Sequence, residues 1–465
     1  MSGSITIRLT TAVKQTTLRN KAVILNVILG ALALLSLSLT LWQWLVARRF
    51  PLHRRAAKPV SLLNPVCDSP CGGVAPSSVQ PSTLNPQPPV TLLKPVKGCD
   101  AVTESCLRSW FQQAYPGPVQ LLFGVATADD PVCAIIHQLI RQFPDRDAQL
   151  VVCGPLVGAN AKVSKLAELE RLAKHEILMV SDADVRVPPD LLLNAIAPFA
   201  PGSTASTSAL PGLVCCFYRL ANPTTLAMQW EAIAINADFW SQVLQSQSLK
   251  PIDFALGAVM ATRRPCLAEI GGFQALADCL ADDYQLGHRI TKRGHSIALC
   301  PVVVECWSDP MGWSEVWKHQ LRWARTIRIC QPLPYFFSLL SNPTLWPLVW
   351  LLARPAALSS ACFVLCLIIR ILTALDLQQR LAPPFTGGGR ASSRAQTGSK
   401  DRAREDARPP TPSQAAWRYA WLIPLKDLLQ AAIWLLAFLG NHIEWRGVRM
   451  RLRPDGTLER AQAGS

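Results

Sequence analysis

The sequence predicts an α/β domain with a mostly parallel sheet flanked by helices, held between N-terminal and C-terminal transmembrane helices. Three observations lead to this prediction. Strand-like apolar runs alternate with helix-like segments between residues 90 and 331, the pattern of a parallel sheet covered by helices. Long apolar runs stand near both ends of the chain. Several strand-like runs in the middle end at acidic residues, where open α/β sheets bind ligands.

The first apolar run, Ala22–Ala47, contains no charged residue and exceeds the roughly 20 residues that cross a bilayer. Lys21 and Arg48 flank it, and Trp42 and Trp44 suit the membrane interface. A cleaved signal peptide is the alternative. The run is long and late for that, and arginines rather than small residues follow it. We therefore expect a signal anchor.

Two further apolar regions lie near the C-terminus. In Leu345–Leu375, Arg354 is followed by a proline, so this residue could divide a re-entrant pair of segments or extend toward the interface. Lys426 and Asp427 interrupt the third region, Trp417–Gly440. The part after them is too short to span alone and could lie in the interface. The number of C-terminal spans stays open.

The net charge of +15 could indicate nucleic acid. The basic residues, however, cluster beside the apolar runs, as at Arg48-Arg49 and in the tail from Arg446. That placement is typical of contact with anionic lipid headgroups. We therefore expect a membrane and no nucleic acid as partner. Because both flanks of the first span are basic, loop charge does not decide its orientation.

Composition divides the chain into eight parts. A Pro-rich linker precedes the α/β domain, and a polar, basic insert that we expect to be disordered separates the C-terminal apolar regions. The parts are an N-terminal flank (1–21), the anchor (22–47), a basic and Pro-rich linker (48–89), the α/β domain (90–331), a membrane region (332–383), the insert (384–413), a membrane or interfacial region (414–445) and a basic tail (446–465).

Within the α/β domain, short apolar runs bounded by turn residues predict strands, and longer segments with helical spacing of apolar residues predict helices. In chain order these are the strand Val90–Leu93, helix Ser105–Tyr115, strand Val119–Val125, helix Pro131–Phe143, strand Gln149–Cys153, helix Lys162–Lys174, strand Ile177–Val180 and helix Tyr284–Arg293.

Asp182 and Asp184 follow the strand Ile177–Val180 directly. Residues two apart in an extended segment point to the same face, so both carboxylates could meet one hard cation. Mg²⁺ or Mn²⁺ held by one or two carboxylates also takes substrate phosphates as ligands. The alternative is a solvated acidic turn, which this motif alone would favour.

Two more acidic pairs occupy similar places. Asp129 and Asp130 follow the strand Val119–Val125 and could accept hydrogen bonds from a ribose or a base. The alternative is a helix cap, a role that suits Asp129. Asp282 and Asp283 stand at the start of a helix, where capping again explains them.

The segment Trp313–Arg328 predicts an amphipathic helix with apolar residues on one face and basic residues elsewhere. Such a helix is typical of a membrane surface, and it could also present a cation to an active site near the lipid. The residues predicted to share the apolar face are Trp313, Trp317, Leu321, Ala324 and Ile327.

Taken together, the order of these motifs resembles that of inverting, membrane-bound family 2-type glycosyltransferases, and most closely the ceramide glucosyltransferase family. Bacterial members associated with hopanoids are similar too. The family pattern is three acids followed by (Q/R)xxRW, matched here by Asp130, Asp182, Asp283 and His319-Gln-Leu-Arg322-Trp323. Supporting matches are Leu92–Gly98, Gly158–Lys162, Arg264 with Gly271-Gly272, and Trp445-Arg-Gly447.

The sequence departs from this pattern at two positions. His319 stands where the family has Gln or Arg, which puts the role of that position in doubt. Asp184 completes an Asp-x-Asp motif where the animal ceramide enzymes have the first acid alone.

The resemblance implies a GT-A-like, Rossmann-type fold and transfer of a sugar, with glucose the first expectation, from a UDP-sugar to a lipid hydroxyl such as that of ceramide. It assigns Asp130 to the uridine, with Lys162 as a further candidate for donor binding. Asp182 and Asp184 would bind Mg²⁺ or Mn²⁺, and His319 would belong to the substrate site.

For catalysis, the resemblance implies that Asp283 is the general base for the acceptor hydroxyl. Asp282 would support it, because two adjacent acids raise one pKa. Arg322 would stabilise the departing diphosphate, and Trp323 would pack against the sugar or the acceptor. Since the family uses cytosolic UDP-sugars, it also implies a multi-pass membrane protein whose catalytic domain faces the cytosol.

Three alternatives remain. The same chemistry could act on a hopanoid, a diacylglycerol or a polyisoprenyl phosphate, or could use UDP-N-acetylglucosamine. The chain could instead be a membrane scaffold that has lost catalysis, although the presence of all the acids and of Arg322-Trp323 argues against this. A processive polysaccharide synthase would need more spans.

Overall fold

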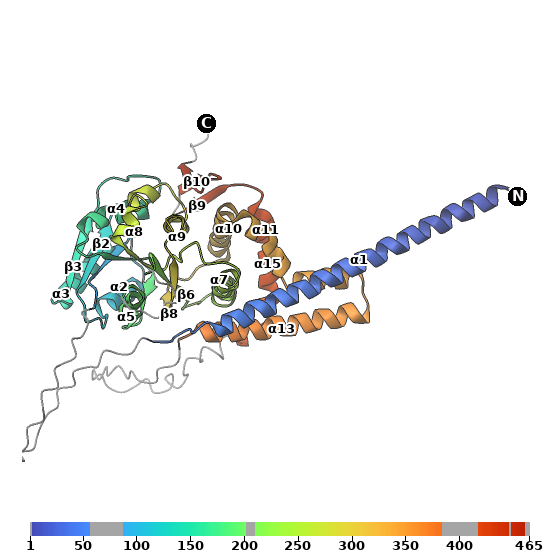
Figure 1. The fold of residues 1–465 in the computed structure, drawn as a ribbon, viewed down its shortest axis with the longest axis horizontal. Helices are drawn as coiled ribbons and strands as arrows, with labels where there is room; N and C mark the ends of the chain where they lie inside the picture. Colours follow the sequence, from blue (N-terminus) through green and yellow to red (C-terminus); the bar gives the residue numbers. More distant parts are fainter. Residues whose placement is uncertain (1, 56–86, 201–209, 384–416, 446–447, 461–465) are drawn as a thin grey trace, which may run out of the picture.

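The structure is a computed structural model that describes residues 2–55, 87–200, 210–383, 417–445 and 448–460 (Figure 1). Most of the predicted linker (48–89) and of the predicted insert (384–413) lies outside the described residues.

The centre of the molecule is an eight-stranded mixed sheet in the order β3-β2-β1-β4-β7-β6-β8-β5. The four strands from β3 to β4 are parallel, as are β6 and β8, whereas β7 and β5 pair antiparallel with their neighbours. The strands are β1 (Val90–Pro95), β2 (Val119–Val125), β3 (Asp147–Val152), β4 (Ile177–Ser181), β5 (Val185–Arg186), β6 (Leu213–Leu220), β7 (Val259–Arg263) and β8 (Ile297–Cys306).

Helices cover both faces of this sheet (Figure 1). Leu92 and Leu93 alternate along β1 and enter two different hydrophobic clusters, one on each face, as side chains of successive strand residues must. The helices of this part are α2 (Thr103–Phe111), α3 (Val132–Gln142), α4 (Ala161–Leu172), α5 (Leu191–Ile196), η1 (Ala197–Phe199), α6 (Leu226–Ile233), the π-helix η2 (Ala234–Phe239), α7 (Trp240–Gln247), α8 (Arg264–Ala268), η3 (Phe273–Leu276), α9 (Asp282–Lys292) and α10 (Trp313–Cys330). The predicted sheet flanked by helices is confirmed.

Within the described part of the chain, two helical segments are long and apolar enough to cross a membrane: Arg19–Arg49 within α1 (Ser2–Arg49), and α13 (Ala357–Leu381). They contact each other and run side by side away from the sheet (Figure 1). A third candidate is a pair of segments bent by 56°, Pro332–Ser341 and Leu345–Ala353. This pair comprises α11 (Pro332–Phe337), η4 (Ser338–Ser341) and α12 (Leu345–Ala353), and α15 (Leu422–Ala437) follows later. The predicted apolar helices at both ends are confirmed.

A buried cluster of charges joins the C-terminal helices to the α/β domain. Arg370 of α13 makes two hydrogen bonds to Asp427 of α15, from Nη2 and Nε, at 2.8 and 2.9 Å. Its Nη2 also donates to Asp238 of η2 at 2.9 Å, and Lys426 contacts both carboxylates. Buried charges pair in this way because an apolar surrounding cannot solvate them. Lys426 and Asp427, which interrupt the third apolar region, are therefore partners of a charge in the second.

The hydrophobic core is shared with these helices. Leu375 and Leu377 of α13 and Ile423 of α15 belong to the same buried cluster as Leu93 of β1. One face of the central sheet thus depends on residues beyond position 331.

A small antiparallel sheet closes the described chain, in the order β11-β10-β9. Its strands are β9 (His442–Trp445), β10 (Val448–Leu452) and β11 (Leu458–Arg460). The sequence predicted no strands here: β9 lies at the end of the predicted membrane or interfacial region (414–445), and β10 and β11 lie in the predicted basic tail (446–465). This sheet packs against the segment that precedes α9.

Candidate active site

Lys162 connects two of the predicted acids. Its Nζ lies 2.7 Å from Asp182 Oδ1 and 3.0 Å from Asp282 Oδ2. Asn160 caps α4 by accepting from the backbone N–H of Lys162 at 3.0 Å, which fixes the start of the helix. Burial alone would lower the pKa of Lys162, but the attraction of Asp182 and Asp282 outweighs it and raises this pKa. Lys162 is therefore a cation that holds two acids from distant segments.

Asp184 carries unfavourable negative charge. Asp184 is exposed to solvent, but desolvation by nearby protein atoms, and then repulsion by Asp182, raise the pKa of its carboxyl to about 6. We call Asp182, Asp184, Asp282 and Asp283 the acid cluster. A divalent cation would relieve this repulsion.

The donor set limits which cation would fit. Among the described residues, no group of three or more His, Cys, Asp or Glu side chains is placed to hold a metal ion. Asp182 and Asp184 therefore fit a hard cation that takes its other ligands from phosphate and water, as Mg²⁺ and Mn²⁺ do.

Asp283 is placed differently from its neighbour Asp282. Asp282 is buried and paired with Lys162, whereas Asp283 accepts a hydrogen bond from the backbone N–H of Tyr284 at 2.8 Å. Burial, and then repulsion by Asp282, raise the pKa of Asp283 to about 6. A carboxylate with such a pKa suits proton abstraction near neutral pH.

Gly257 makes room for this carboxylate. A Cβ at position 257 would lie 2.7 Å from Asp283 Oδ2, closer than real contacts allow. The segment between α7 and β7 therefore approaches Asp283 along a bare backbone, which limits where the carboxylate can lie. The sequence analysis did not single out this glycine.

A second buried lysine lies beneath the acid cluster. Lys94 of β1 donates from Nζ to Ser181 Oγ at 3.2 Å and to the carbonyl oxygen of Asp182 at 2.5 Å. Burial lowers the pKa of Lys94 to about 8.

Asp130 lies where β2 leads into α3. Its Oδ1 and Oδ2 accept from the backbone N–H of Gly98 at 2.9 and 3.1 Å, and Oδ1 also accepts from that of Val132 at 3.1 Å. The N-cap position of α3 is Pro131, and Asp130, one residue earlier, accepts from the first backbone N–H of the helix. The structure shows no contact between Asp130 and Lys162. The role of Asp130 toward uridine therefore remains a prediction.

The (Q/R)xxRW segment lies on α10, which Tyr284 connects to α9. The hydroxyl of Tyr284 donates to the carbonyl oxygen of Cys330 at 2.8 Å. Trp323 contacts Phe239 of the π-helix, with ring centroids 6.1 Å apart, and the ring of His319 at 4.8 Å. Arg322, on the same helix, is partly exposed.

The predicted apolar face of α10 is only partly buried. Its central residues pack against the core, but Trp313 and Ile327 near the two ends are 44% and 42% exposed. Ala324 is buried, while Trp317 and Leu321 are half-buried against the cluster around Trp230. The apolar face therefore divides between the core and the surface, and the position of this helix at a membrane surface stays a prediction.

The C-terminal sheet supports the segment that leads into the acid cluster. The backbone N–H of Leu458 donates to the carbonyl oxygen of Asp278 at 2.7 Å, and that of Leu280 donates to Gly456 at 3.3 Å. From the other side, Asn160 Nδ2 donates to the carbonyl oxygen of Cys279 at 2.8 Å. The segment before Asp282 is therefore held between α4 and β11.

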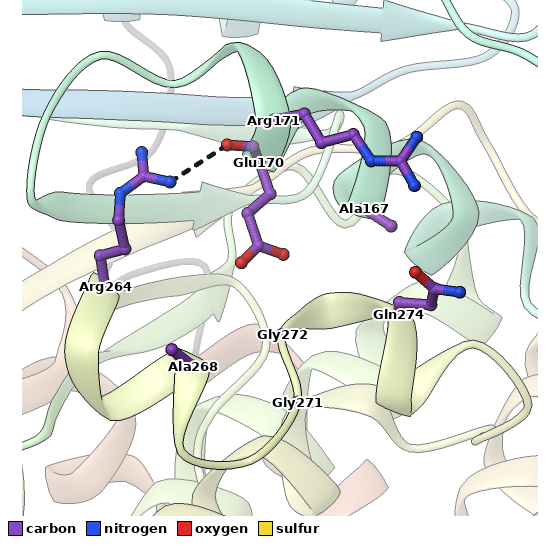
Figure 2. A pocket seen from close by; sticks show the side chains of 8 residues that line it. All are labelled: Ala167, Glu170, Arg171, Arg264, Ala268, Gly271, Gly272 and Gln274. Carbon is purple, nitrogen blue, oxygen red and sulfur yellow. Dashed lines mark hydrogen bonds between the residues drawn. The ribbon is translucent and has the colours of Figure 1, made fainter.

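The remaining family match lies elsewhere. Arg264 donates to the carbonyl oxygens of Glu170, Ala173 and His175 at 3.4, 2.7 and 3.3 Å, which satisfies the end of α4. Together with Gly271 it lines a pocket of about 420 Å³ (Figure 2). In the antiparallel pairing of β4 with β7, Arg263 lies opposite Ile177, the first residue of β4, so Arg264 lies near the start of β4. Asp182, in contrast, follows the end of β4. The pocket is thus separate from the acid cluster.

Comparison with known proteins agrees with the predicted resemblance. A ceramide glucosyltransferase of Caenorhabditis elegans is 25% identical over 219 residues, which are 46% of this chain and 44% of the relative. The Candida albicans ceramide glucosyltransferase is 36% identical over 118 residues, 23% of this chain and 22% of the relative. The matched segments thus span less than half the length of these relatives.

Among solved structures, a mannosyltransferase from Pyrobaculum calidifontis, in complex with GDP-Man and Mn²⁺, overlaps 77% of this chain and 96% of its own, with a TM-score of 0.46 and 20% identity. Glucosyl-3-phosphoglycerate synthase from Mycobacterium tuberculosis, with Mn²⁺ and UDP-glucose bound, overlaps 48% of this chain and 73% of its own, with a TM-score of 0.30 and 15% identity. The model of glycosyl transferase family 21 matches residues 25–458, nearly the whole chain. The predicted resemblance to ceramide glucosyltransferases is confirmed, and this chain belongs to glycosyl transferase family 21.

Proposed function

We propose that this glycosyltransferase moves glucose from UDP-glucose to the hydroxyl group of a ceramide-like lipid at the membrane surface. One observation carries the proposal. Lys162 holds Asp182 and Asp282 together, and the adjacent Asp283 has a pKa raised to about 6. Family membership and relatives named ceramide glucosyltransferase support the donor and the acceptor.

Asp182 and Asp184 are proposed to hold Mg²⁺ or Mn²⁺ with the donor diphosphate. When bound, such a cation offsets the charge of the leaving group as a Lewis acid does. Lys162 contributes a fixed positive charge from the protein side. Asp130 is proposed to contact the uridine with the lone pairs that its bonds to Gly98 and Val132 leave free.

The proposed chemical step is direct displacement. Asp283 removes the proton of the acceptor hydroxyl while the oxygen attacks the anomeric carbon. Burial, and then repulsion by Asp282, which is paired with Lys162, keep the pKa of Asp283 high. Arg322 stabilises the departing diphosphate, and Trp323 packs against the sugar or the acceptor.

The proposed setting is a multi-pass membrane protein whose catalytic domain faces the cytosol, where UDP-sugars are found. The two apolar helices leave the sheet in the same direction (Figure 1), which suits a domain seated on one side of a bilayer. The buried cluster of Arg370 and Asp427 attaches these helices to the domain.

The test uses the full chain, purified into lipid nanodiscs with Mn²⁺. Tritiated UDP-glucose and UDP-N-acetylglucosamine are each offered with ceramide, diacylglycerol, a hopanoid or a polyisoprenyl phosphate, and labelled lipid is counted. We expect transfer with UDP-glucose and ceramide, and none from the Asp283→Asn variant. Labelling of another lipid instead, or of none, would refute the proposed acceptor.

A further inference from the structure

A buried carboxylate that the proposed mechanism does not use lies beneath the (Q/R)xxRW segment. Glu231 of α6 is 1% exposed. Its Oε1 accepts hydrogen bonds from His319 Nδ1 at 2.6 Å and from Gln320 Nε2 at 2.9 Å. A carboxylate in this position must be satisfied by donors, because it has lost its water. Two successive residues of α10 supply them.

These bonds fix the imidazole of His319. An ionised carboxylate accepts and never donates, so the proton of the short bond belongs to Nδ1. In the tautomer protonated at Nδ1 alone, Nε2 carries a lone pair that can accept a hydrogen bond. The side chain of His319 is 30% exposed, against 1% for that of Glu231. The accessible part of the ring is therefore the part directed away from Glu231, which includes Nε2.

A row of aromatic rings leads from His319 to the acid cluster. His319 meets Trp323 edge-on, with centroids 4.8 Å apart. Trp323 contacts Phe239 at 6.1 Å, and Phe239 contacts Tyr218 at 5.4 Å. Tyr218 lies on β6, which pairs with β8 and with β7, and the other partner of β7 is β4, which leads into Asp182. Burial raises the pKa of Tyr218 well above its usual value, and repulsion by Cys306, Asp283, Asp182 and Glu231 adds to that rise.

We propose that Glu231 is a positioning residue that holds His319 with Nδ1 buried, so that Nε2 accepts a hydrogen bond from a substrate hydroxyl group beside Trp323. The substrate contact rests on the proposed function, since the sugar and the lipid acceptor are the sources of hydroxyl groups. It gives a role to the residue that stands where the family has Gln or Arg. His319 contacts the substrate, and Glu231 acts through His319.

Two substitutions of His319 separate its two nitrogens. His319→Asn places an amide near the position of Nδ1 and can keep the bond to Glu231, whereas His319→Gln places one near Nε2. We expect His319→Asn to lower kcat/KM for transfer about tenfold, the equivalent of one good hydrogen bond. We expect His319→Gln to lose less activity than His319→Asn, because it keeps an acceptor near Nε2 although it loses the bond to Glu231. Full activity in His319→Asn would overturn the substrate contact.

A double-mutant cycle tests whether Glu231 acts through His319. Glu231→Gln keeps the shape of the side chain and removes its charge. We expect it to reduce transfer in the parent and to cause little further loss in His319→Asn. If the fold-losses in transfer caused by the two single substitutions multiply in the double variant, the positioning role of Glu231 is overturned. Comparing slow hydrolysis of the donor with transfer identifies the hydroxyl: a sugar contact lowers both rates, whereas an acceptor contact lowers transfer alone.

One measurement is independent of turnover. The full chain contains seven histidines, so ¹⁵N-histidine labelling gives few NMR signals, and His319 is identified by the signal missing in His319→Asn. We expect the tautomer protonated at Nδ1 in the parent and a changed signal in Glu231→Gln. An Nε2-protonated tautomer would refute the role of Glu231. An inactive parent would refute the proposed function and the substrate contact, while the tautomer would still decide the role of Glu231.

Discussion

The two halves of the central sheet differ in how their residues reach the acid cluster. In the half from β3 to β4, all strands are parallel, and Asp182 of the acid cluster follows the end of β4 directly. In the other half, antiparallel pairings of β7 and β5 intervene, and the acids Asp282 and Asp283 come from the start of a helix. The first half places its side chains by strand register, the second by packing of loops and helices.

This difference makes Lys162 the junction between the halves. Its Nζ contacts Asp182 of the first half and Asp282 of the second. The second half receives further support from the C-terminal sheet and from Tyr284, which bonds to α10. We therefore expect substitutions in the second half to change the position of the general base while leaving the donor side intact.

The largest effect is expected from Asp283→Asn. An amide cannot take the acceptor proton, so kcat for transfer should fall by about 10²- to 10⁴-fold, while UDP-sugar affinity stays close to that of the parent. In the parent, activity should rise as the pH passes upward through about 6, because Asp283 acts as a base only when deprotonated. Single-turnover rates between pH 5 and 8, with UDP binding measured in parallel, check both points. An Asn variant with most of its kcat would exclude Asp283 as the base.

The next effect concerns the junction itself. Lys162→Met removes the cation and leaves Asp182 and the buried Asp282 without this partner. Breaking a buried ion pair costs about 3–5 kcal/mol, so we expect a clear drop in thermal stability together with weaker donor binding. Lys174→Met is the matched control, because its ion pair with Asp147 is exposed and worth little. Equal unfolding temperatures for the two variants would contradict the role of Lys162 as the junction between the two halves.

Sequence patterns predicted the first half of the sheet well. The strands at Val90–Leu93 and Ile177–Val180 are continuous apolar runs buried on both faces, a signal that needs no knowledge of distant residues. The family pattern contained Asp130, Asp182 and Asp283. In the structure Lys162 contacts Asp182 and Asp282, the neighbour of Asp283, whereas Asp130 is bonded to Gly98 and Val132.

Pairings between distant residues were not predictable. Arg370 bonds to Asp238, 132 positions away, and Glu231 to His319, 88 positions away. No local periodicity encodes such a pair, because each member reads as an isolated charge in an apolar segment. The strands of the C-terminal sheet were missed for a related reason: arginines alternate along β10, and their charge hides the apolar side that packs on Leu280.

A smaller effect is expected at Gly257. In Gly257→Ala the new Cβ would meet Asp283 Oδ2 at 2.7 Å, so the carboxylate must move. A displacement of about 1 Å can reduce catalysis by up to about 10²-fold, and we expect a loss of kcat with unchanged donor affinity. Gly154→Ala is the control, since its Cβ would meet no atom within 4 Å. Equal kcat in the two variants would show that the backbone at Gly257 does not restrain the base.

The smallest effect is expected from the C-terminal sheet, which holds the segment before Asp282 from outside. Leu458 is 7% exposed and packs with Leu280, so Leu458→Ala should loosen this support. Coupling through packed residues is typically about 0.5–2 kcal/mol, and we expect a fall in kcat of several-fold with little change in UDP affinity. Glu459→Gln is the control, because its ion pair with Arg453 is exposed. The rate of backbone amide hydrogen exchange at residues 278–283 measures how firmly this segment is held. We expect this rate to rise in Leu458→Ala and not in Glu459→Gln. Unchanged exchange together with unchanged kcat would mean that α4 and α10 position the general base without the C-terminal sheet.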